Sequence, residues 1–220
     1  MSYEPDKFKY ILSVDIGVKH LGLSLSAVHH DFTMYEVVWV DMIDITQFVH
    51  LTKEAKHKCE LYHDKTYTDY LEHLFFMYEE LFEAVDYILI ERQPPQGYVV
   101  VEQLIFSKYR NKAILISPNS VHKYLGWTTT KLDYEARKVS SIKVCLKHIL
   151  RDYTLDTFNS FDRKHDMADS ICMVLFWANR MNVKYKKEEK LKRLEKKMEH
   201  AKANGLFHSH LYLERFRYIE

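Results

Sequence analysis

An apolar run near the N-terminus, residues 11–17 (ILSVDIG), ends in an acid and a glycine and restricts the possible folds of the chain. The run is typical of a β-strand, with Leu12 and Val14 on one side and Ile11, Ser13 and Asp15 on the other. Asp15 therefore ends a strand that otherwise favours burial. A buried carboxylate is costly unless it is paired or binds a cation, so the fold must supply partners for Asp15.

Three more acids stand in comparable places. Glu91 ends the apolar run 87–90, and Asp166 and Asp169 open an apolar helix at residues 166–181. Residues three apart share one helix face, and the first turn of a helix favours anions. We expect these acids and Asp15 to meet around divalent metal ions, because hard cations such as Mg²⁺ prefer carboxylate oxygens. Two such ions can activate a water and stabilise the leaving oxygen in phosphodiester cleavage.

Each acid alone also has an ordinary structural explanation. Asp15 is a common type of strand-end residue, Glu91 can pair with Arg92, and Asp166 is a frequent helix N-cap. The ordered combination of two strand-end acids and a D-x-x-D helix start is what favours the metal site.

The hydrophobic pattern predicts an α/β fold. Its mixed five-stranded sheet has three antiparallel strands followed by two parallel ones, and helices flank the sheet. The strands are expected at residues 8–15, 21–28, 34–42, 87–91 and 113–117, and the helices at 66–85, 98–109, 120–125, 134–151, 166–181 and 184–204. Asp15 then lies on the central strand and Glu91 on its neighbour, at the carboxyl ends where functional groups gather. Residues 44–65 are polar and have no clear pattern.

Composition restricts the class of protein. The chain has 220 residues, which suits one domain. No apolar run reaches the roughly 18 residues of a membrane span, and the N-terminal residues do not have the pattern of a secretory signal or a transit peptide. Three widely spaced cysteines suggest a reducing compartment. We therefore expect a cytoplasmic protein that is not secreted and has no membrane partner.

Charge is concentrated near the C-terminus. The net charge is only +1, yet residues 184–203 hold nine Lys/Arg against four Glu, an excess of five. We expect a domain at residues 1–183 and a charged helical extension at 184–220. A short apolar seam is formed by Leu191, Leu194, Met198 and Ala201. The helix could pack on the domain, pair with a partner or present its cations to DNA, and we favour packing with a solvated charged face.

Four ordered blocks of sequence carry a family resemblance. They are residues 11–17 with 21–24, residues 88–93, residues 116–123 continuing to 136–138, and residues 164–170. Together they resemble the RuvC-like Holliday junction resolvases of the RNase H-like superfamily. The resemblance is closest to the branch found in poxviruses and other large DNA viruses, which has a fungal mitochondrial relative.

The resemblance implies a site and a reaction. Asp15, Glu91, Asp166 and Asp169 match the metal-binding catalytic acids of the family. Lys138 falls where the family often has a lysine near the active site, although its neighbour Arg137 could take that role. The implied activity is cleavage that depends on Mg²⁺, with Mn²⁺ as a substitute, and needs no small-molecule cofactor. A homodimer would nick a four-way DNA junction symmetrically, in the cytoplasmic viral factory of a host cell.

Basic and aromatic residues near these blocks are candidates for DNA contacts. Cations can neutralise phosphates and make affinity depend on salt, although each could equally lie on a solvated helix face. The candidates are Lys108, Arg110, Lys112, Lys123, Arg137, Arg163 and Lys164. Tyr124, Trp127 and Tyr134 could stack on bases, but residues of this kind more often belong to the core.

Other functions share parts of this pattern. An RNase H-type nuclease acting on RNA–DNA hybrids would use the same metal chemistry. A junction-binding protein without turnover would keep the fold, but the presence of all four acids argues against it. ATPases that open with a D-x-G strand need further glycine loops for phosphate, and the chain has only five glycines.

Overall fold

The structure is a computed structural model, and it describes residues 7–17, 19–33, 35–47, 66–127 and 134–203. Part of the segment without a clear sequence pattern, residues 48–65, lies outside the described residues. By backbone contacts the chain divides into two units, Met1–Arg180 and Met181–Glu220. The domain limit expected at residue 183 stays a prediction.

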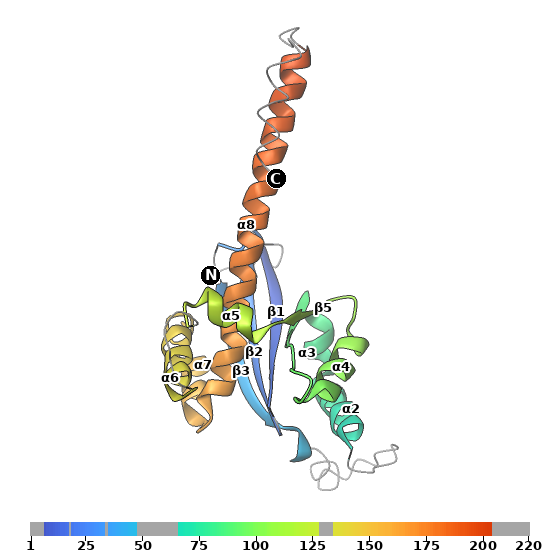
Figure 1. The fold of residues 1–220 in the computed structure, drawn as a ribbon, viewed down its shortest axis with the longest axis vertical. Coiled ribbons are helices and arrows are strands. Elements are labelled where there is room, and N and C mark those ends of the chain that lie inside the picture. Colours follow the sequence, from blue (N-terminus) through green and yellow to red (C-terminus); the bar gives the residue numbers. More distant parts are fainter. Residues whose placement is uncertain (1–6, 18, 34, 48–65, 128–133, 204–220) are drawn as a thin grey trace. The chain divides into compact units, whose positions relative to one another are not determined.

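A five-stranded mixed sheet forms the centre of the first unit (Figure 1). Its strands are β1 (Phe8–Ile16), β2 (His20–His29), β3 (Tyr35–Asp44), β4 (Tyr87–Glu91) and β5 (Ala113–Ile116). They lie in the order β3-β2-β1-β4-β5, with β2 antiparallel to β1 and β3, and β4 parallel to β1 and β5. The predicted sheet, with the first strand at its centre, is confirmed.

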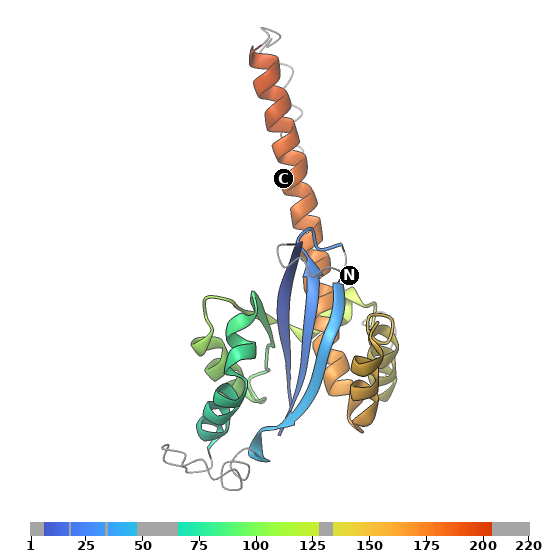
Figure 2. The same cartoon turned by 180° about the vertical axis from the view of Figure 1, so that it is seen from behind.

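Helices cover both faces of the sheet. They are α2 (Tyr67–Met77), α3 (Glu79–Ala84), α4 (Val99–Lys108), α5 (Pro118–Tyr124), α6 (Tyr134–Cys145), α7 (Asp152–Ser160) and α8 (Lys164–Ala203), with a short 3₁₀ helix η2 (Ile45–Gln47). Figures 1 and 2 show α2, α3 and α4 on one side of the sheet, and α6, α7 and the start of α8 on the other. Among the described helices, none has the length and apolar character needed to cross a bilayer.

A hydrophobic core lies between the sheet and α2–α4. Leu12, Val14 and Ile16 of β1 point into it and are at most 6% exposed. Leu74 of α2 and Ile105 of α4 pack in the same cluster and are fully buried. The period-2 alternation of β1 therefore produces a sheet face that needs a helical cover.

One expected helix is two. The apolar period over residues 66–85 predicted a continuous helix, but α2 ends and α3 begins at Tyr78, whose φ is −116° and ψ 21°. The Tyr78 hydroxyl donates a hydrogen bond to Asp41 of β3, with 3.0 Å between the oxygens. The prediction of one helix was wrong because both short helices present apolar residues to the same core, so the period continues across the break.

The prediction of a single helix over residues 134–151 was also wrong. Helix α6 ends at Cys145, and α7, which the pattern did not predict, follows. Tyr153 and Thr154 of α7 both donate to the carbonyl oxygen of Val38 on the edge strand β3, at 2.8 and 3.2 Å. Contacts between residues so far apart in the chain fix α7, and a local pattern does not reveal them.

The last two expected helices are one. Helix α8 continues from Lys164 to Ala203 without a break between residues 181 and 184. No proline or glycine stands in this interval, so nothing in the backbone chemistry ends the helix there. The change from apolar to charged residues marks a change of environment instead of a helix end.

Candidate active site

The site begins where two parallel strands end. In the β1–β4 pair, Val14 lies opposite Ile90, and Asp15 and Glu91 are the next residues of their strands. Each strand end therefore contributes one acid at the same edge of the sheet.

Helix α8 approaches the sheet very closely at this point. Asp15 lies opposite Gly22 in the β1–β2 pair. A Cβ atom added at Gly22 would lie 2.2 Å from the carbonyl oxygen of Asp166 and 2.9 Å from the amide nitrogen of Met167. The first turns of α8 can therefore rest on the backbone of β2 only because residue 22 has no side chain.

This approach brings the four predicted acids into one pocket of about 340 Å³. Its walls also carry three cations and several ring side chains. The residues that line it include Asp15, Glu91, Asp166, Asp169, Arg137, Lys138, Arg163, His122, Trp127, Tyr134 and His165. The four acids come from β1, β4 and α8, three elements far apart in the sequence.

The acids perturb one another strongly. Burial, followed by the charges of Glu91 and Asp169, raises the pKa of Asp15 well above its usual range. Burial also raises the pKa of Glu91, and it raises the pKa of Asp169 to about 7. Burial, together with repulsion between the carboxylates, thus disfavours their charged forms, which is the situation that a bound divalent cation relieves.

Protein donors engage two of the acids directly. Gln93 Nε2 donates to Glu91 Oε2 at 2.6 Å, and Arg163 Nε donates to Asp166 Oδ2 at 2.8 Å. His165 Nε2 lies 3.0 Å from the other oxygen of Asp166. Asp166 is buried, whereas the Arg163 side chain is half exposed.

The donor set suits a hard divalent cation, since it consists of carboxylate oxygens in one pocket. In this arrangement, however, no three His, Cys, Asp or Glu side chains among the described residues stand together as a ready ligand group. The hydrogen bonds of Glu91 to Gln93 and of Asp166 to Arg163 direct these two carboxylates to protein partners. The residues therefore fit a metal by chemistry and location, with the carboxylates needing to turn toward it.

Two cysteines hold the helices of the site together. Cys145 of α6 donates from its thiol to the carbonyl oxygen of Ala168 on α8, at 3.1 Å, and its sulfur lies 3.8 Å from that of Cys172. Both residues are buried. Burial raises the pKa of the Cys145 thiol well above its usual range, so the protonated donor persists. This contact fixes the helix that carries Arg137 and Lys138 against the helix that carries two of the acids.

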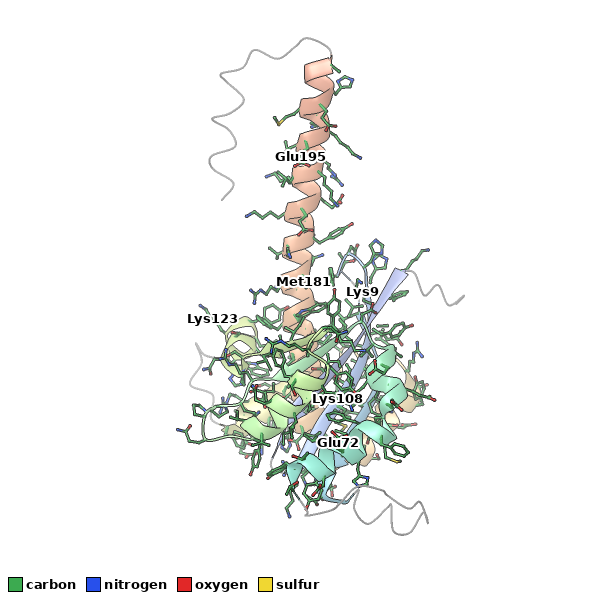
Figure 3. The ribbon with its side chains drawn as sticks, turned by 90° about the vertical axis from the view of Figure 1, so that its right-hand side faces the viewer. Lys9, Glu72, Lys108, Lys123, Met181 and Glu195 are labelled. Atoms are coloured by element: carbon green, nitrogen blue, oxygen red, sulfur yellow. The ribbon has the colours of Figure 1, made fainter. Side chains whose placement is uncertain are left out.

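The predicted DNA-contacting cations separate into two groups. Arg137 and Arg163 line the pocket, as does Lys138, whose Nζ lies 3.5 Å from Glu135 Oε1. The others do not line it: Lys108, Arg110, Lys112, Lys123 and Lys164. Figure 3 shows Lys108 and Lys123 apart from each other, on α4 and α5.

The cations around α4 have local partners. Lys108 Nζ lies 4.7 Å from the ring centre of Phe75, and the guanidinium of Arg110 lies 5.6 Å from that of Phe106. Lys112 pairs with Glu83 at 3.5 Å. A role for these cations in DNA binding stays a prediction.

The three candidate aromatic residues differ in exposure. Trp127 is buried and its ring centre lies 5.6 Å from that of His122, in the pocket wall. Tyr134 also lines the pocket but is 60% exposed. Tyr124 does not line it and packs edge-on against Phe176. Of the three, Tyr134 is thus the one placed to meet a substrate at the pocket.

Two residues of the site, Gln93 and His165, have no role predicted from the sequence. Gln93 lies two residues beyond Glu91, and Glu102, which is buried on α4, accepts the Gln93 backbone N–H. His165 directly precedes Asp166. Adjacency to a predicted acid was the available signal for both, but the contacts depend on side-chain directions that spacing does not give.

The fold and the acid pocket together indicate a nuclease of the class expected from the sequence. Residues 9–182 match the family described as the poxvirus A22 protein, and the chain belongs to this family. No curated protein sequence matches the chain significantly.

Three solved structures with a similar fold are named as Holliday junction resolvases. The fowlpox virus resolvase, in its complex with substrate Holliday junction DNA, is 18% identical with a TM-score of 0.53, covering 78% of this chain and 98% of that one. A second structure of the fowlpox virus enzyme gives a TM-score of 0.52 at 18% identity, over 78% and 99% of the two chains. The yeast mitochondrial Holliday junction resolvase is 20% identical with a TM-score of 0.53, over 80% of each chain. The predicted fold and family resemblance are confirmed.

Proposed function

We propose that this protein is a structure-selective DNA endonuclease that resolves four-way junctions by paired, metal-dependent phosphodiester cleavage. The observation that carries the proposal is the convergence of Asp15, Glu91, Asp166 and Asp169 in one pocket that also carries cations. Membership of the poxvirus A22 family supports it. So does the likeness of the fold to proteins named as Holliday junction resolvases, one of them in complex with its junction.

The four acids are the residues that would hold Mg²⁺, or Mn²⁺ in its place. When bound, such ions activate a water and stabilise the leaving oxygen of the phosphodiester. The raised pKa values of Asp15 and Asp169 support this assignment, because burial and the neighbouring carboxylates disfavour the charged forms that a bound cation would favour.

The cations of the pocket would hold the scissile phosphate. Arg137, Lys138 and Arg163 line the same cavity as the acids. Arg163 is half exposed and now pairs with Asp166, so it can exchange this carboxylate for a phosphate when the acid turns to a metal ion. The planar guanidinium group of Arg163 can donate hydrogen bonds to two oxygens of one phosphate.

The protein would act as a homodimer, because a four-way junction has two-fold symmetry and two symmetric nicks need two sites. We further propose that it works in the cytoplasmic viral factory of a host cell. Family resemblance supports both points.

The test is cleavage of a synthetic four-way junction by wild type and Asp15→Asn in the presence of Mg²⁺ or Mn²⁺. We expect the substitution to lower the cleavage rate by about 10³-fold or more, since it removes a metal ligand worth several kcal/mol of transition-state stabilisation. Junction binding should persist. Asp162→Asn is the matched control, because Asp162 is exposed beside α8 and does not line the pocket. Undiminished cleavage by Asp15→Asn would contradict the assignment.

A substrate panel separates the alternatives that share this chemistry. The proposal predicts cleavage of the four-way junction well ahead of an RNA–DNA hybrid and a linear duplex. Preference for the hybrid would favour an RNase H-type nuclease. Tight junction binding without any metal-dependent cleavage by the wild type would favour a non-catalytic binding protein.

A further inference from the structure

The second unit of the chain contains the last part of α8, and the charges there are sorted around the helix. Lys186, Lys190, Arg193 and Lys197 follow one another at steps of four, three and four residues, so they lie on one face. All four are exposed. We call them the basic stripe. At 1.5 Å per residue the stripe is about 16 Å long.

The glutamates of this segment lie mainly on the other side. At about 100° per residue, Glu188, Glu195 and Glu199 fall roughly opposite the stripe. Glu189 borders the stripe. Lysines outside the stripe hold two of these acids: Lys184 Nζ lies 3.8 Å from Glu188 Oε1, and Lys192 Nζ lies 3.6 Å from Glu189 Oε1.

The stripe therefore lacks local compensation. Within the described part of the chain, none of its four cations takes part in an ion pair. Like charges at this spacing repel one another. Binding of a polyanion with regularly spaced charges would relieve this repulsion. A DNA duplex carries one negative charge per about 1.7 Å of its axis, which gives several phosphates over the length of the stripe.

The segment also lies beyond the shared family domain. The family match ends at residue 182, and the stripe begins at residue 186. Its charge pattern thus lies outside the sequence that matches the family and includes none of the residues that line the acid pocket.

We infer that the basic stripe is a second DNA-contacting surface, which binds the phosphate backbone of a duplex arm of the junction. This inference rests on the proposed function, because it takes the junction as the substrate. The contacts are with phosphates, so they add affinity that depends on salt and carry no sequence preference. Each phosphate contact releases counterions and contributes about −0.9 to the slope of log K against log salt.

The experiment compares two full-length triple variants. Lys186→Gln/Lys190→Gln/Lys197→Gln removes three stripe cations. Lys184→Gln/Lys192→Gln/Lys196→Gln removes three exposed lysines from the rest of the same helix. The two variants change net charge and composition identically. Equilibrium binding to a synthetic four-way junction is measured with EDTA present over about 50 to 200 mM salt, and circular dichroism checks that both variants keep their helix.

The stripe variant should lose about 2.7 from the salt slope, the contribution of three phosphate contacts. Over a fourfold change in salt, a contribution of that size is worth about 40-fold in affinity. The control variant should stay close to wild type. Cleavage rates at saturating enzyme should be nearly unchanged in both variants, because neither changes the acid pocket.

Other outcomes overturn the inference. An unchanged salt slope in the stripe variant would contradict the inference. An equal loss of salt slope in the control variant would also contradict it, because net charge alone would then explain the effect. If the stripe variant lost binding to anionic phospholipid vesicles while junction binding stayed intact, the surface would be assigned to membranes instead. Failure of the proposed function gives a different result. If Asp15→Asn cleaved normally while the stripe variant had a reduced salt slope, the metal site would be contradicted and the stripe would not.

Discussion

The two faces of the central sheet are built from the same strands but carry different side chains. On one face, Leu12, Val14 and Ile16 of β1 are buried against α2, α3 and α4. On the other face, Ser13 and Asp15 alternate with them, and Gly22 lies opposite Asp15 on β2. The first face is therefore hydrocarbon. The second face also carries the buried Ile11 farther along β1, but it is small and polar around Asp15, and we call this part the polar face.

The difference separates stability from chemistry. Burying a large aliphatic side chain stabilises a fold by about 1.5–3 kcal/mol, so the apolar face supplies much of the stability. The polar face contributes less hydrocarbon, but its small residues let the backbone of α8 come into contact with β2. That approach places Asp166 and Asp169 in the same pocket as Asp15.

The largest effect on cleavage is expected from a substitution that adds a side chain between β2 and α8 on the polar face. In Gly22→Ala, the new Cβ would fall 2.2 Å from the carbonyl oxygen of Asp166, so the start of α8 must shift. A misplacement of about 1 Å can cost about 10²-fold in rate. We therefore expect junction cleavage to fall by about that factor or more, together with a clear loss of thermal stability.

The matched control for Gly22→Ala is Ser24→Ala on the same face of β2. Ser24 is fully buried, and its hydroxyl makes no hydrogen bond within the described structure. Its removal should change the free energy of unfolding little and leave cleavage nearly normal. Equal activity of Gly22→Ala and wild type would show that the close approach of α8 is not needed for the site.

The opposite result is expected on the apolar face. Leu12→Ala should lower the free energy of unfolding by about 2–5 kcal/mol, the usual cost of a cavity at a buried leucine. Cleavage per folded molecule should stay unchanged, because the side chain points away from the pocket. Denaturant melts measure the first quantity, and single-turnover cleavage below the melting range measures the second. Leu146→Ala, at a residue that is 42% exposed, is the control. If Leu12→Ala lost cleavage without losing stability, the apolar face would not act mainly on stability and the comparison of the two faces would be wrong.

The sequence predicted what depends on local pattern. The alternation in β1, the acids that follow two strands and the spacing of Asp166 and Asp169 are readable because each is fixed within a few residues. The break at Tyr78 and the whole of α7 depend on contacts with β3, which no local period shows. The importance of Gly22 is of the same kind, since it becomes visible only when α8 lies across β2.

A smaller effect is expected in the pH dependence of stability, and it comes from an acid of the pocket. The pKa of Asp169 is raised to about 7 in the folded protein, whereas an unfolded aspartate titrates near 3.9. Between these values the folded protein holds a proton that the unfolded chain releases, so this group destabilises the fold as pH rises through the window. Histidines such as His122 and His165, whose pKa values are lowered by burial, act in the opposite direction, and the total profile mixes both effects.

Asp169→Asn isolates the acid, since the amide resembles the protonated carboxyl group and leaves the histidines in place. The melting temperature of the metal-free variant should match that of wild type only at about pH 3.5, below both pKa values. It should exceed that of wild type increasingly as pH rises to 8, where each 1 kcal/mol corresponds to roughly 2–4 °C for a domain of this size. Asp162→Asn, at an exposed position, should show no such divergence. If the Asp169→Asn and wild-type curves stayed parallel from pH 5 to pH 8, the polar face would not store unfavourable charge. The absence of such strain would remove the electrostatic reason for a metal ion to bind there.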